Sequence, residues 1–385
     1  SISGDMQLNA AAEREVMFDH VWRRTNDIFY KTGFHGINWE AMGKDYRKFL
    51  PHIGNGYEFS ELLSEILGEL NVSHCGSSYG APTNNPDLTA SLGIFIDYQH
   101  KGNGVKVAEV IAGGPLDKAG FNVAAGTVIE SIDGESIAAD KDLSQFLNRK
   151  AGKNVLLTLN ENGKTRDLVV KPISMGEESQ LLYKRWVRRN AEEVDKLSNG
   201  QLGYIHIPGM NDGAYRTAIE EAMGKYAGRK ALLVDTRNNG GGDLVADLAM
   251  WLSGKRFMEY SNDRETANYE PTFRWNKPSI SLANEANYSD GHCYSFAYQY
   301  LKIGKLVGMP VPGTCSFAGW EMLQDGQTRW GTVPMGVRMM DGSGRYLENH
   351  QTEPDIKLMN EYDKVNKGKD QQLEAAVAEL MKEIK

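Results

Sequence analysis

A single serine in the last third of the chain stands where a nucleophile could be held. Ser289 lies in the sequence Ala-Asn-Tyr-Ser-Asp-Gly at 286–291, between a predicted strand and a predicted helix. At a helix start it lies beside a free backbone N–H, here that of Asp290, and the helix dipole favours negative charge that develops there. A serine in this position can also be an ordinary N-cap, and this window alone favours the N-cap.

A run of three glycines could supply a second group for such chemistry. Gly240, Gly241 and Gly242 follow a predicted strand and open a predicted helix. Without side chains the backbone can approach a ligand closely, and its N–H groups can stabilise an oxyanion. A phosphate loop is the rival interpretation, but the run lacks the Gly-Lys-Ser/Thr ending of a P-loop and the spacing of a dinucleotide site. A plain turn before a helix is the simplest alternative.

A serine hydroxyl is unreactive at neutral pH and needs a base, so the eight histidines are the next candidates. His74 follows a predicted helix and precedes a glycine-containing loop, which suits an exposed and oriented imidazole. His350, in a C-terminal loop, ranks only modestly lower. His206 is expected to be buried within a strand. His292 lies nearly one helical turn after Ser289 and could make at most a peripheral contact with it. The remaining histidines carry no local signal: His20, His35, His52 and His100.

Three successive patterns predict the elements that position these residues, and together they predict a multi-domain α+β fold. Apolar residues recur at helical spacing up to about residue 80, and one such stripe ends just before His74. Short strands follow to about residue 173, and strands then alternate with helices, which predicts βαβ crossovers. We expect a helical domain at 1–85 that contributes the base, a β-rich module at 86–174 and an α/β domain at 175–385.

Composition limits the classes of function. The 385 residues include 41% hydrophobic and 24% charged residues with a net charge of −8, which is typical of soluble globular proteins and argues against general binding to nucleic acid or anionic membranes. No apolar run approaches the roughly 20 residues that span a bilayer. Acidic residues and histidines lack metal-ligand spacing, so we expect no metal and no cofactor. Cys75, Cys293 and Cys315 are too few for a disulfide framework, and we expect Cys75 and Cys293 to be buried thiols.

The middle segment resembles a PDZ domain. The resemblance rests on Ser-Leu-Gly-Ile-Phe at 91–95, Gly-Gly-Pro-Leu-Asp-Lys-Ala-Gly at 113–120 and Ile-Asp-Gly at 132–134. It implies a β-barrel-like module in which the loop from Ser91 to Gly93 offers N–H groups to a peptide carboxylate and the next strand pairs with an extended peptide. A module that only spaces the flanking domains is an equally weighted alternative.

Four motifs in order resemble the C-terminal half of the tricorn proteases over essentially the whole chain. They are Asn-Val-Ser-His at 71–74, Asn-Asn-Gly-Gly-Gly-Asp at 238–243, Tyr-Ser-Asp-Gly at 288–291, and Leu-Glu-Asn at 347–349 followed by Glu-Pro-Asp-Ile at 353–356. The resemblance implies a crotonase-like α/β catalytic domain, the spiral shared with ClpP, and a serine endopeptidase that works through an acyl-enzyme.

The resemblance also implies the residues of the reaction. Ser289 would be the nucleophile and His74 its general base, with Ser73 and Glu348 completing a hydrogen-bonded tetrad. Physical chemistry agrees, because Glu348 acting through Ser73 would fix the imidazole tautomer and stabilise its charged form.

Two further pairs of residues match by the same resemblance. The backbone N–H groups of Gly242 and Asp290 would form the oxyanion hole. Gly241 and Asp263 would bind substrate, and Asp263 would receive basic side chains in a specificity pocket that, in the family, a neighbouring subunit completes.

The same resemblance implies the partners. We expect oligopeptides or unfolded segments as substrates and a homo-oligomer, with a hexamer as the implied form. The opening Ser-Ile-Ser-Gly-Asp suggests a cut through a longer protein, and the family's β-propellers are not in this sequence. The expected compartment is the cytoplasm, or the periplasm if a leader has been removed.

Two alternatives stay open. C-terminal processing peptidases share the PDZ module and the α/β fold but use a serine–lysine dyad, and the place of that lysine falls near Thr314, where no lysine stands. A non-catalytic peptide-binding scaffold of the same fold would have lost the nucleophile or the base, whereas both are present here. Labelling by a serine-directed phosphonate separates the enzyme from the scaffold.

Overall fold

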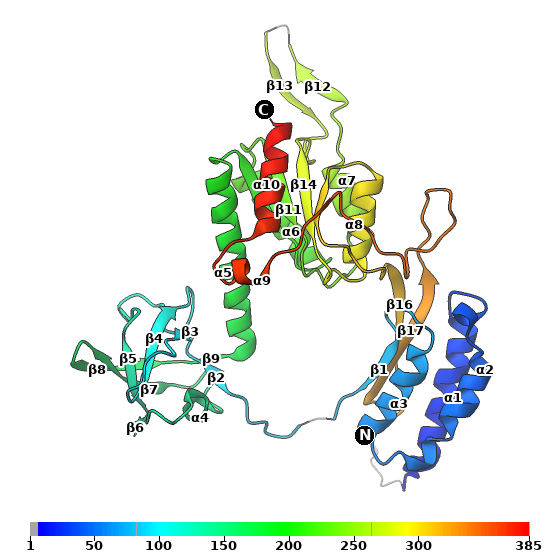
Figure 1. Cartoon of the computed structure of the whole chain (residues 1–385), viewed down its shortest axis with the longest axis horizontal. Helices are drawn as coiled ribbons and strands as arrows, with labels where there is room; N and C mark the ends of the chain where they lie inside the picture. Colours follow the sequence, from blue (N-terminus) through cyan, green and yellow to red (C-terminus); the bar gives the residue numbers. More distant parts are fainter. Residues whose placement is uncertain (1–6, 82, 263, 385) are drawn as a thin grey trace, which may run out of the picture. The chain divides into compact units, whose positions relative to one another are not determined.

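A computed structural model describes residues 7–81, 83–262 and 264–384 (Figure 1). The chain forms two compact units, the first made of Ser1–Ala81 with Glu193–Lys385 and the second of Pro82–Glu192. The predicted helical and α/β segments therefore share one unit, and the predicted three-way division at 85 and 174 stays a prediction. Within the described residues, we find no helix with both the length and the apolar character that crossing a membrane requires.

Three helices open the first unit, and each begins at an asparagine cap. The side chains of Asn9, Asn38 and Asn55 each accept a hydrogen bond from the backbone N–H three residues on, which satisfies a donor that the helix leaves free. The buried faces of these helices pack with Trp330 from much later in the chain. The helices are α1 (Ala10–Ile28), α2 (Trp39–Arg47) and α3 (Gly56–Gly68), with 3-10 turns at Phe34–Gly36 and Leu50–His52.

A three-stranded antiparallel sheet joins these helices to the later part of the same unit. Its order is β1-β17-β16, and Gly76 of β1 pairs with Gly331 of β17. Because β1 begins two residues after His74, this pairing fixes the region of His74 against a distant stretch of the chain. The strands are β1 (Gly76–Tyr79), β16 (Ser316–Met322) and β17 (Thr328–Gly336).

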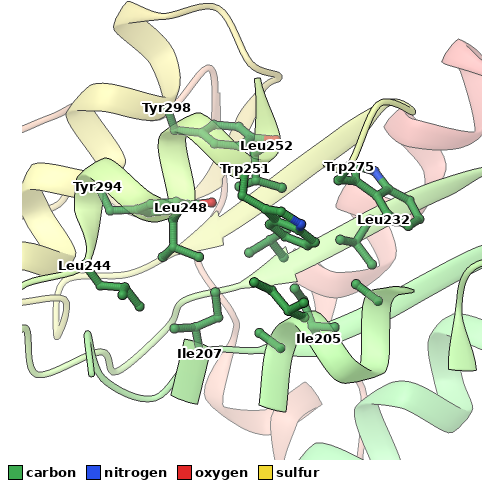
Figure 2. Packing of buried hydrophobic residues seen from close by; sticks show 14 of the residues in the cluster. Ile205, Ile207, Leu232, Leu244, Leu248, Trp251, Leu252, Trp275, Tyr294 and Tyr298 are labelled. Atoms are coloured by element: carbon green, nitrogen blue, oxygen red, sulfur yellow. The ribbon is translucent and has the colours of Figure 1, made fainter. Parts of the chain in front are cut away.

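A five-stranded parallel sheet lies at the centre of the first unit, in the order β10-β11-β14-β15-β18. Its first four strands are buried throughout, as expected of a parallel sheet with both faces covered. Figure 2 shows Leu248, Trp251 and Tyr294 packed with Ile205 and Leu232 of the strands. The strands are β10 (Leu202–His206), β11 (Ala231–Asp235), β14 (Ser279–Ala283), β15 (Leu306–Gly308) and β18 (Ile356–Lys357). The helices are α6 (Asp212–Glu220), continued by a π-helical turn at Glu221–Lys225, then α7 (Val245–Leu252), α8 (Asp290–Tyr300), α9 (Tyr362–Val365) and α10 (Gln371–Glu383).

The strands that precede the two predicted site loops are neighbours in this sheet. β11 ends at Asp235, β14 ends at Ala283, and the two strands pair in parallel. Parallel neighbours end at the same edge of a sheet, which is where open α/β sheets bind their ligands. The glycine run and the loop to Ser289 therefore leave the sheet side by side.

The second unit is an antiparallel sheet with its own core, which includes Val107, Ile129 and Leu157. Its order is β3-β4-β5-β7-β8, with β6 beside β5, and β2 pairs separately with β9. β3 forms one edge of this sheet. The elements are β2 (Ala90–Ser91), β3 (Ile94–Ile96), β4 (Val105–Val110), β5 (Val128–Ile132), β6 (Glu135–Ser136), α4 (Leu143–Leu147), β7 (Val155–Glu161), β8 (Lys164–Val170) and β9 (Ile173–Ser174), followed by α5 (Met175–Leu197).

A two-stranded hairpin of β12 (Met258–Ser261) and β13 (Thr266–Glu270) extends from the first unit (Figure 1). Its side chains are largely exposed, among them Met258 and Tyr260. Asp263, predicted for the specificity pocket, lies between these strands and outside the described residues.

A buried ion pair at the end of β11 generates a stability prediction. Arg237 donates to Asp235 and Asp370, each at 2.7 Å, and the side chains of Arg237 and Asp235 are 4% and 0% exposed. Arg237→Ala would leave a buried carboxylate without its main counter-charge, which costs about 3–5 kcal/mol of the free energy of unfolding. Denaturant titration measures this loss. Lys44→Ala, which breaks the exposed pair with Glu40, is the control and should unfold at the wild-type midpoint. A wild-type midpoint for Arg237→Ala would contradict the prediction.

Candidate active site

Ser289 lies on a sharp turn between β14 and α8, with φ +56° and ψ −124°. Such angles are unusual for a residue with a side chain, and strained backbone of this kind concentrates at functional sites. The N–H of Ser289 donates to Thr314 Oγ1 at 2.9 Å, and its carbonyl accepts the N–H of Cys293. The serine occupies the N-cap position of α8, yet its side chain makes no capping hydrogen bond. The ordinary N-cap interpretation is therefore wrong for this hydroxyl.

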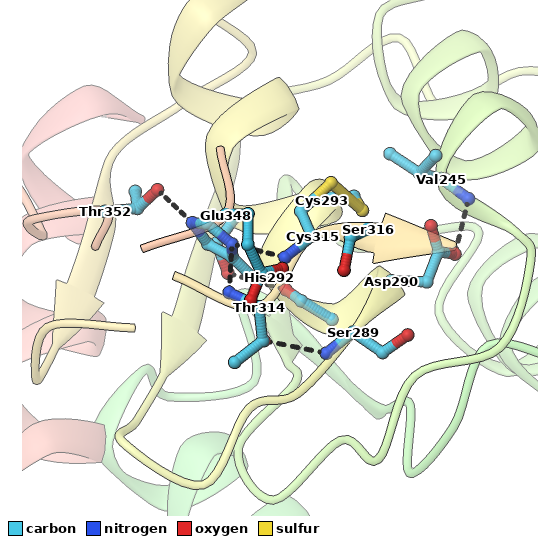
Figure 3. The surroundings of a disulfide bond; sticks show 12 residues. Val245, Ser289, Asp290, His292, Cys293, Thr314, Cys315, Ser316, Glu348 and Thr352 are labelled. Carbon is cyan, nitrogen blue, oxygen red and sulfur yellow. Dashed lines mark hydrogen bonds between the residues drawn. A yellow bond between two sulfur atoms is a disulfide. The ribbon is translucent and has the colours of Figure 1, made fainter. Parts of the chain in front are cut away.

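A buried histidine supports this turn through Thr314, as Figure 3 shows. His292 Nδ1 accepts the N–H groups of Thr314 and Cys315, each at 3.1 Å, and its Nε2–H donates to Thr352 Oγ1 at 2.9 Å. Burial lowers the pKa of His292 to about 4, so the ring is neutral near pH 7, as this pattern of bonds requires. His292 thus acts on Ser289 through Thr314 and does not meet its hydroxyl.

The prediction of a free, buried thiol at Cys293 is wrong, because Cys293 forms a disulfide with Cys315 (Figure 3). The two cysteines are 22 residues apart, and only the fold brings α8 beside the segment that leads into β16. The bond therefore joins the helix that follows Ser289 to the segment before Ser316. Cys75 is free, and burial raises its pKa to about 11.

His74, Ser73 and Glu348 form one hydrogen-bonded chain. Ser73 Oγ lies 2.6 Å from His74 Nδ1 and 3.0 Å from Glu348 Oε2, and the Ser73 N–H donates to Glu348 Oε1 at 2.5 Å. The hydroxyl has one hydrogen, so when it donates to the carboxylate its oxygen accepts from Nδ1–H. Nε2 then carries the lone pair, which is the tautomer that a general base needs. Ser316 Oγ lies at the margin of this chain, 3.4 Å from both Ser73 Oγ and His74 Nδ1.

The surroundings of His74 favour the neutral imidazole. Burial lowers the pKa of His74, and the negative charge of Glu348, which is 2% exposed, opposes that shift without cancelling it. A neutral ring whose Nε2 has a free lone pair can accept a proton near pH 7.

Tyr288 joins the histidine to the serine turn. The backbone N–H of His74 donates to Tyr288 Oη at 2.9 Å, and the two ring centroids are 4.7 Å apart. Ser289 is the next residue along the chain. Across the described residues, no hydrogen bond joins Ser289 Oγ to the imidazole. Such bonds commonly tighten only when substrate is bound.

The glycine run lies directly against the serine turn. A Cβ on Gly241 would lie 2.5 Å from Ser289 Cβ, so only glycine fits here. The Tyr288 N–H donates to the carbonyl of Asn239 at 2.9 Å, and Asn239 Oδ1 accepts the N–H of Gly241 at 2.8 Å. Because this N–H is used internally, Gly241 cannot offer it to a substrate, and its predicted role in substrate binding is limited to leaving room.

Two backbone N–H groups at this junction have no hydrogen-bond partner among the described residues. The N–H of Met210 donates to the carbonyl of Gly241, and its carbonyl accepts the N–H of Asp243. This pairing points the N–H of Gly242, which lies between them, away from Met210. Asp290 is the first residue of α8, where helices leave N–H groups free. Among the hydrogen bonds of the described residues, none uses the N–H of Gly242 or of Asp290. These are the two donors predicted for an oxyanion hole.

The side chain of Asp290 links the start of α8 to the start of α7, just after the glycine run. Its Oδ2 accepts the N–H groups of Leu244 at 2.6 Å and Val245 at 3.0 Å, at the start of α7 (Figure 3). Asp290 is 6% exposed, and burial raises its pKa. One residue thus supplies a free N–H from α8 and, through its carboxylate, holds the end of the glycine run.

Several of these supports were not predicted from the sequence. Tyr288 and Asn239 stand inside the predicted motifs, directly before Ser289 and the glycine run. This adjacency is the sequence feature that could have pointed to them. Thr314 and His292 carry no comparable signal, because their contacts depend on how distant segments meet.

In the second unit, the predicted carboxylate-binding loop is partly engaged by its own chain. The Gly93 N–H donates to Ser91 Oγ at 2.9 Å, and the Ser91 hydroxyl donates to Glu178 at 2.6 Å. The edge strand β3 follows this loop, and Arg185 lies over the ring of Phe95 on that strand, 4.9 Å from its centroid. Both predicted roles of this unit, peptide binding and spacing, stay predictions.

No metal centre is found in the ranges that the structure describes, because no group of three or more histidine, cysteine, aspartate or glutamate side chains could hold an ion there.

Three sequence profiles match successive parts of the chain. The profile for the tricorn protease C1 domain matches residues 10–68, that for the tricorn protease PDZ domain matches 92–175, and that for peptidase family S41 matches 201–358. These matches follow the order of the helical segment, the second unit and the parallel-sheet region. Together with the fold they show that the chain combines a tricorn-type helical domain, a PDZ domain and a peptidase S41 domain.

Similar proteins extend the comparison over the whole chain. Tricorn protease of Thermoplasma acidophilum is 30% identical over 96% of this chain and 35% of its own length, and the putative tricorn protease homolog 2 of Streptomyces coelicolor is 28% identical over 92% and 31%. A crystal structure of the tricorn protease superposes with a TM-score of 0.85 at 25% identity, over 98% of this chain and 37% of that one. The chain is a relative of the tricorn proteases, as predicted, and spans about a third of the length of the relatives it matches.

The surroundings of His74 generate a prediction about its titration. Since burial is the larger influence, His74 should titrate below the ordinary value of 6.5. In Glu348→Gln its pKa should fall further, because the lost negative charge is the one that raises it. NMR of the imidazole across pH measures both values. The control is Glu353→Gln, an exposed carboxylate nearby in sequence, which should leave His74 unchanged. A midpoint above 6.5, or a rise in Glu348→Gln, would contradict the electrostatic account.

Proposed function

We propose that this chain hydrolyses peptide bonds through an acyl-enzyme formed on Ser289. His74 takes the hydroxyl proton as Ser289 attacks the carbonyl carbon, and the N–H groups of Gly242 and Asp290 stabilise the resulting oxyanion. His74 then gives that proton to the leaving amine. A water molecule, activated by the same imidazole, attacks the acyl carbon and releases the peptide acid.

One observation carries the proposal. Three features meet at one junction. They are a strained serine whose hydroxyl makes no capping hydrogen bond, two N–H groups that have no partner among the described residues, and a histidine held in the tautomer that can act as a base. Each group alone has a structural explanation, but together they supply the nucleophile, the charge stabilisation and the base that acyl transfer needs.

The remaining expectations belong to this proposal. The substrates are oligopeptides or unfolded segments, basic side chains are received by Asp263, and the active form is a homo-oligomer, a hexamer by family resemblance. A crotonase-type spiral for the α/β domain is supported by the parallel sheet. Of the two compartments expected, the cytoplasm and the periplasm, the Cys293–Cys315 disulfide favours the periplasm, because disulfides are rare in reducing cytosol.

The serine–lysine alternative is disfavoured at the predicted place of the lysine. Thr314 stands there, and its hydroxyl accepts the Ser289 N–H and cannot act as a base. The scaffold alternative has no specific support, because its expected loss of nucleophile or base is not found.

The nucleophile and its base can be tested together. A serine-directed phosphonate should label the wild-type chain at Ser289, and labelling should be lost in Ser289→Ala and fall by orders of magnitude in His74→Ala, because the unassisted hydroxyl is unreactive. Mass spectrometry locates the adduct, and peptide hydrolysis is followed in parallel. Ser253→Ala, at an exposed serine, is the control. A folded wild-type protein that neither takes the label nor cleaves peptides would favour the scaffold.

The oxyanion donors give a second test within the glycine run. A Cβ on Gly242 would lie 1.9 Å from the carbonyl oxygen of Met210, whereas one on Gly240 would meet nothing within 4 Å. Gly242→Ala must therefore displace its N–H, and the loss of one donor lowers kcat by about 100- to 1000-fold. Gly240→Ala is the matched control and should keep wild-type kcat. Equal rates for the two variants would remove Gly242 from the oxyanion hole.

A further inference from the structure

We propose that Tyr288 is a positioning residue that holds the general base, His74, in register with the nucleophile. This inference rests on the proposed function and extends it to a residue for which no role was predicted. Tyr288 is the residue immediately before Ser289, so whatever it fixes is fixed relative to the serine turn.

The first observation is the hydrogen bond to the backbone of the base. His74 has φ +54°, which a residue with a side chain seldom adopts, so this conformation needs support from its surroundings. The His74 N–H donates to Tyr288 Oη at 2.9 Å. A side chain from the serine turn thus holds the backbone from which the imidazole projects.

The second observation is the contact between the ring of Tyr288 and the imidazole of His74. The tyrosine ring lies 4.7 Å from the imidazole, centroid to centroid, with the planes 36° apart. The chain from Ser73 to Glu348 fixes the ring at Nδ1, and the tyrosine ring restricts its remaining rotation from one face. The two contacts therefore act on different degrees of freedom, and both are needed to aim Nε2.

The third observation is that Tyr288 is itself well anchored. Its N–H donates to the Asn239 carbonyl at 2.9 Å, and its carbonyl accepts the N–H of Gly291 at 2.9 Å. The same tyrosine therefore touches the glycine run, the start of α8 and the base. No other hydrogen bond between described residues links His74 directly to the serine turn.

Two substitutions separate the hydroxyl from the ring. Tyr288→Phe keeps the ring and removes the hydrogen bond, so kcat should fall by about tenfold while KM stays within about twofold, as expected when a neutral hydrogen bond is lost. Tyr288→Leu removes the ring as well and should lower kcat by about 100-fold. It should also raise the midpoint of the acidic limb of kcat/KM, because the imidazole becomes more hydrated. Among the described residues, the titratable side chains around His74 are Glu348, whose charge raises the pKa of the imidazole, Tyr288 against the ring, and Cys75 next to it in the chain.

The matched control is Tyr300→Phe at the last residue of α8, away from the base, which removes a tyrosine hydroxyl that donates to the Met340 carbonyl at 2.7 Å. It should keep wild-type kcat and pH profile. Ser289→Ala and His74→Ala belong in the same series, since hydrolysis that survives in them would overturn the proposed function and this inference together. If both are inactive while Tyr288→Phe and Tyr288→Leu keep wild-type kcat and pH profile, the tyrosine proposal alone is overturned. Should Tyr288→Leu fail to fold, Tyr288→Phe decides, and wild-type kcat in it overturns the proposal.

Discussion

One buried carboxylate, that of Glu348, sets the orientation of the His74 imidazole through Ser73. Glu348 is almost fully withdrawn from water, and a charge in that position is costly unless hydrogen bonds compensate it. Ser73, 275 residues earlier in sequence, supplies two of them, from its backbone and from its hydroxyl. That arrangement leaves the serine oxygen to accept from the imidazole of His74. The pairing of β1 with β17 and the packing of Trp330 among the first helices bring the two segments together.

The nucleophile depends on a different constraint, the shared edge of two parallel strands. β11 and β14 end side by side, and the loops that follow are fastened by Asn239, by the carboxylate of Asp290 and by Thr314. These bonds hold Ser289 in a conformation that an isolated turn would not keep. The strain and the unused N–H groups are both products of the same tight junction, so the serine and its anion-stabilising donors are positioned by one set of contacts.

The sequence predicted what local pattern can encode. The fold contains the helices predicted before His74, the strands of the middle segment and the alternating strands and helices that follow. Burial on one face of an element leaves a regular spacing of apolar residues, and this spacing is visible in the sequence. The resemblance to tricorn proteases is confirmed, although it came from motifs and not from periodicity. What could not be read were contacts between distant segments. The Cys293–Cys315 disulfide and the support of Ser289 by Thr314 depend on where α8 meets the chain before β16, and no local pattern records that meeting.

The most direct test is a crystal structure of the phosphonate adduct. If the proposed mechanism holds, Ser289 Oγ will be bonded to phosphorus, one phosphoryl oxygen will lie within hydrogen-bond distance of the N–H groups of Gly242 and Asp290, and His74 Nε2 will lie within hydrogen-bond reach of the adduct. An adduct on another residue, or one on Ser289 with its oxygen turned away from both N–H groups and the imidazole remote, would contradict it.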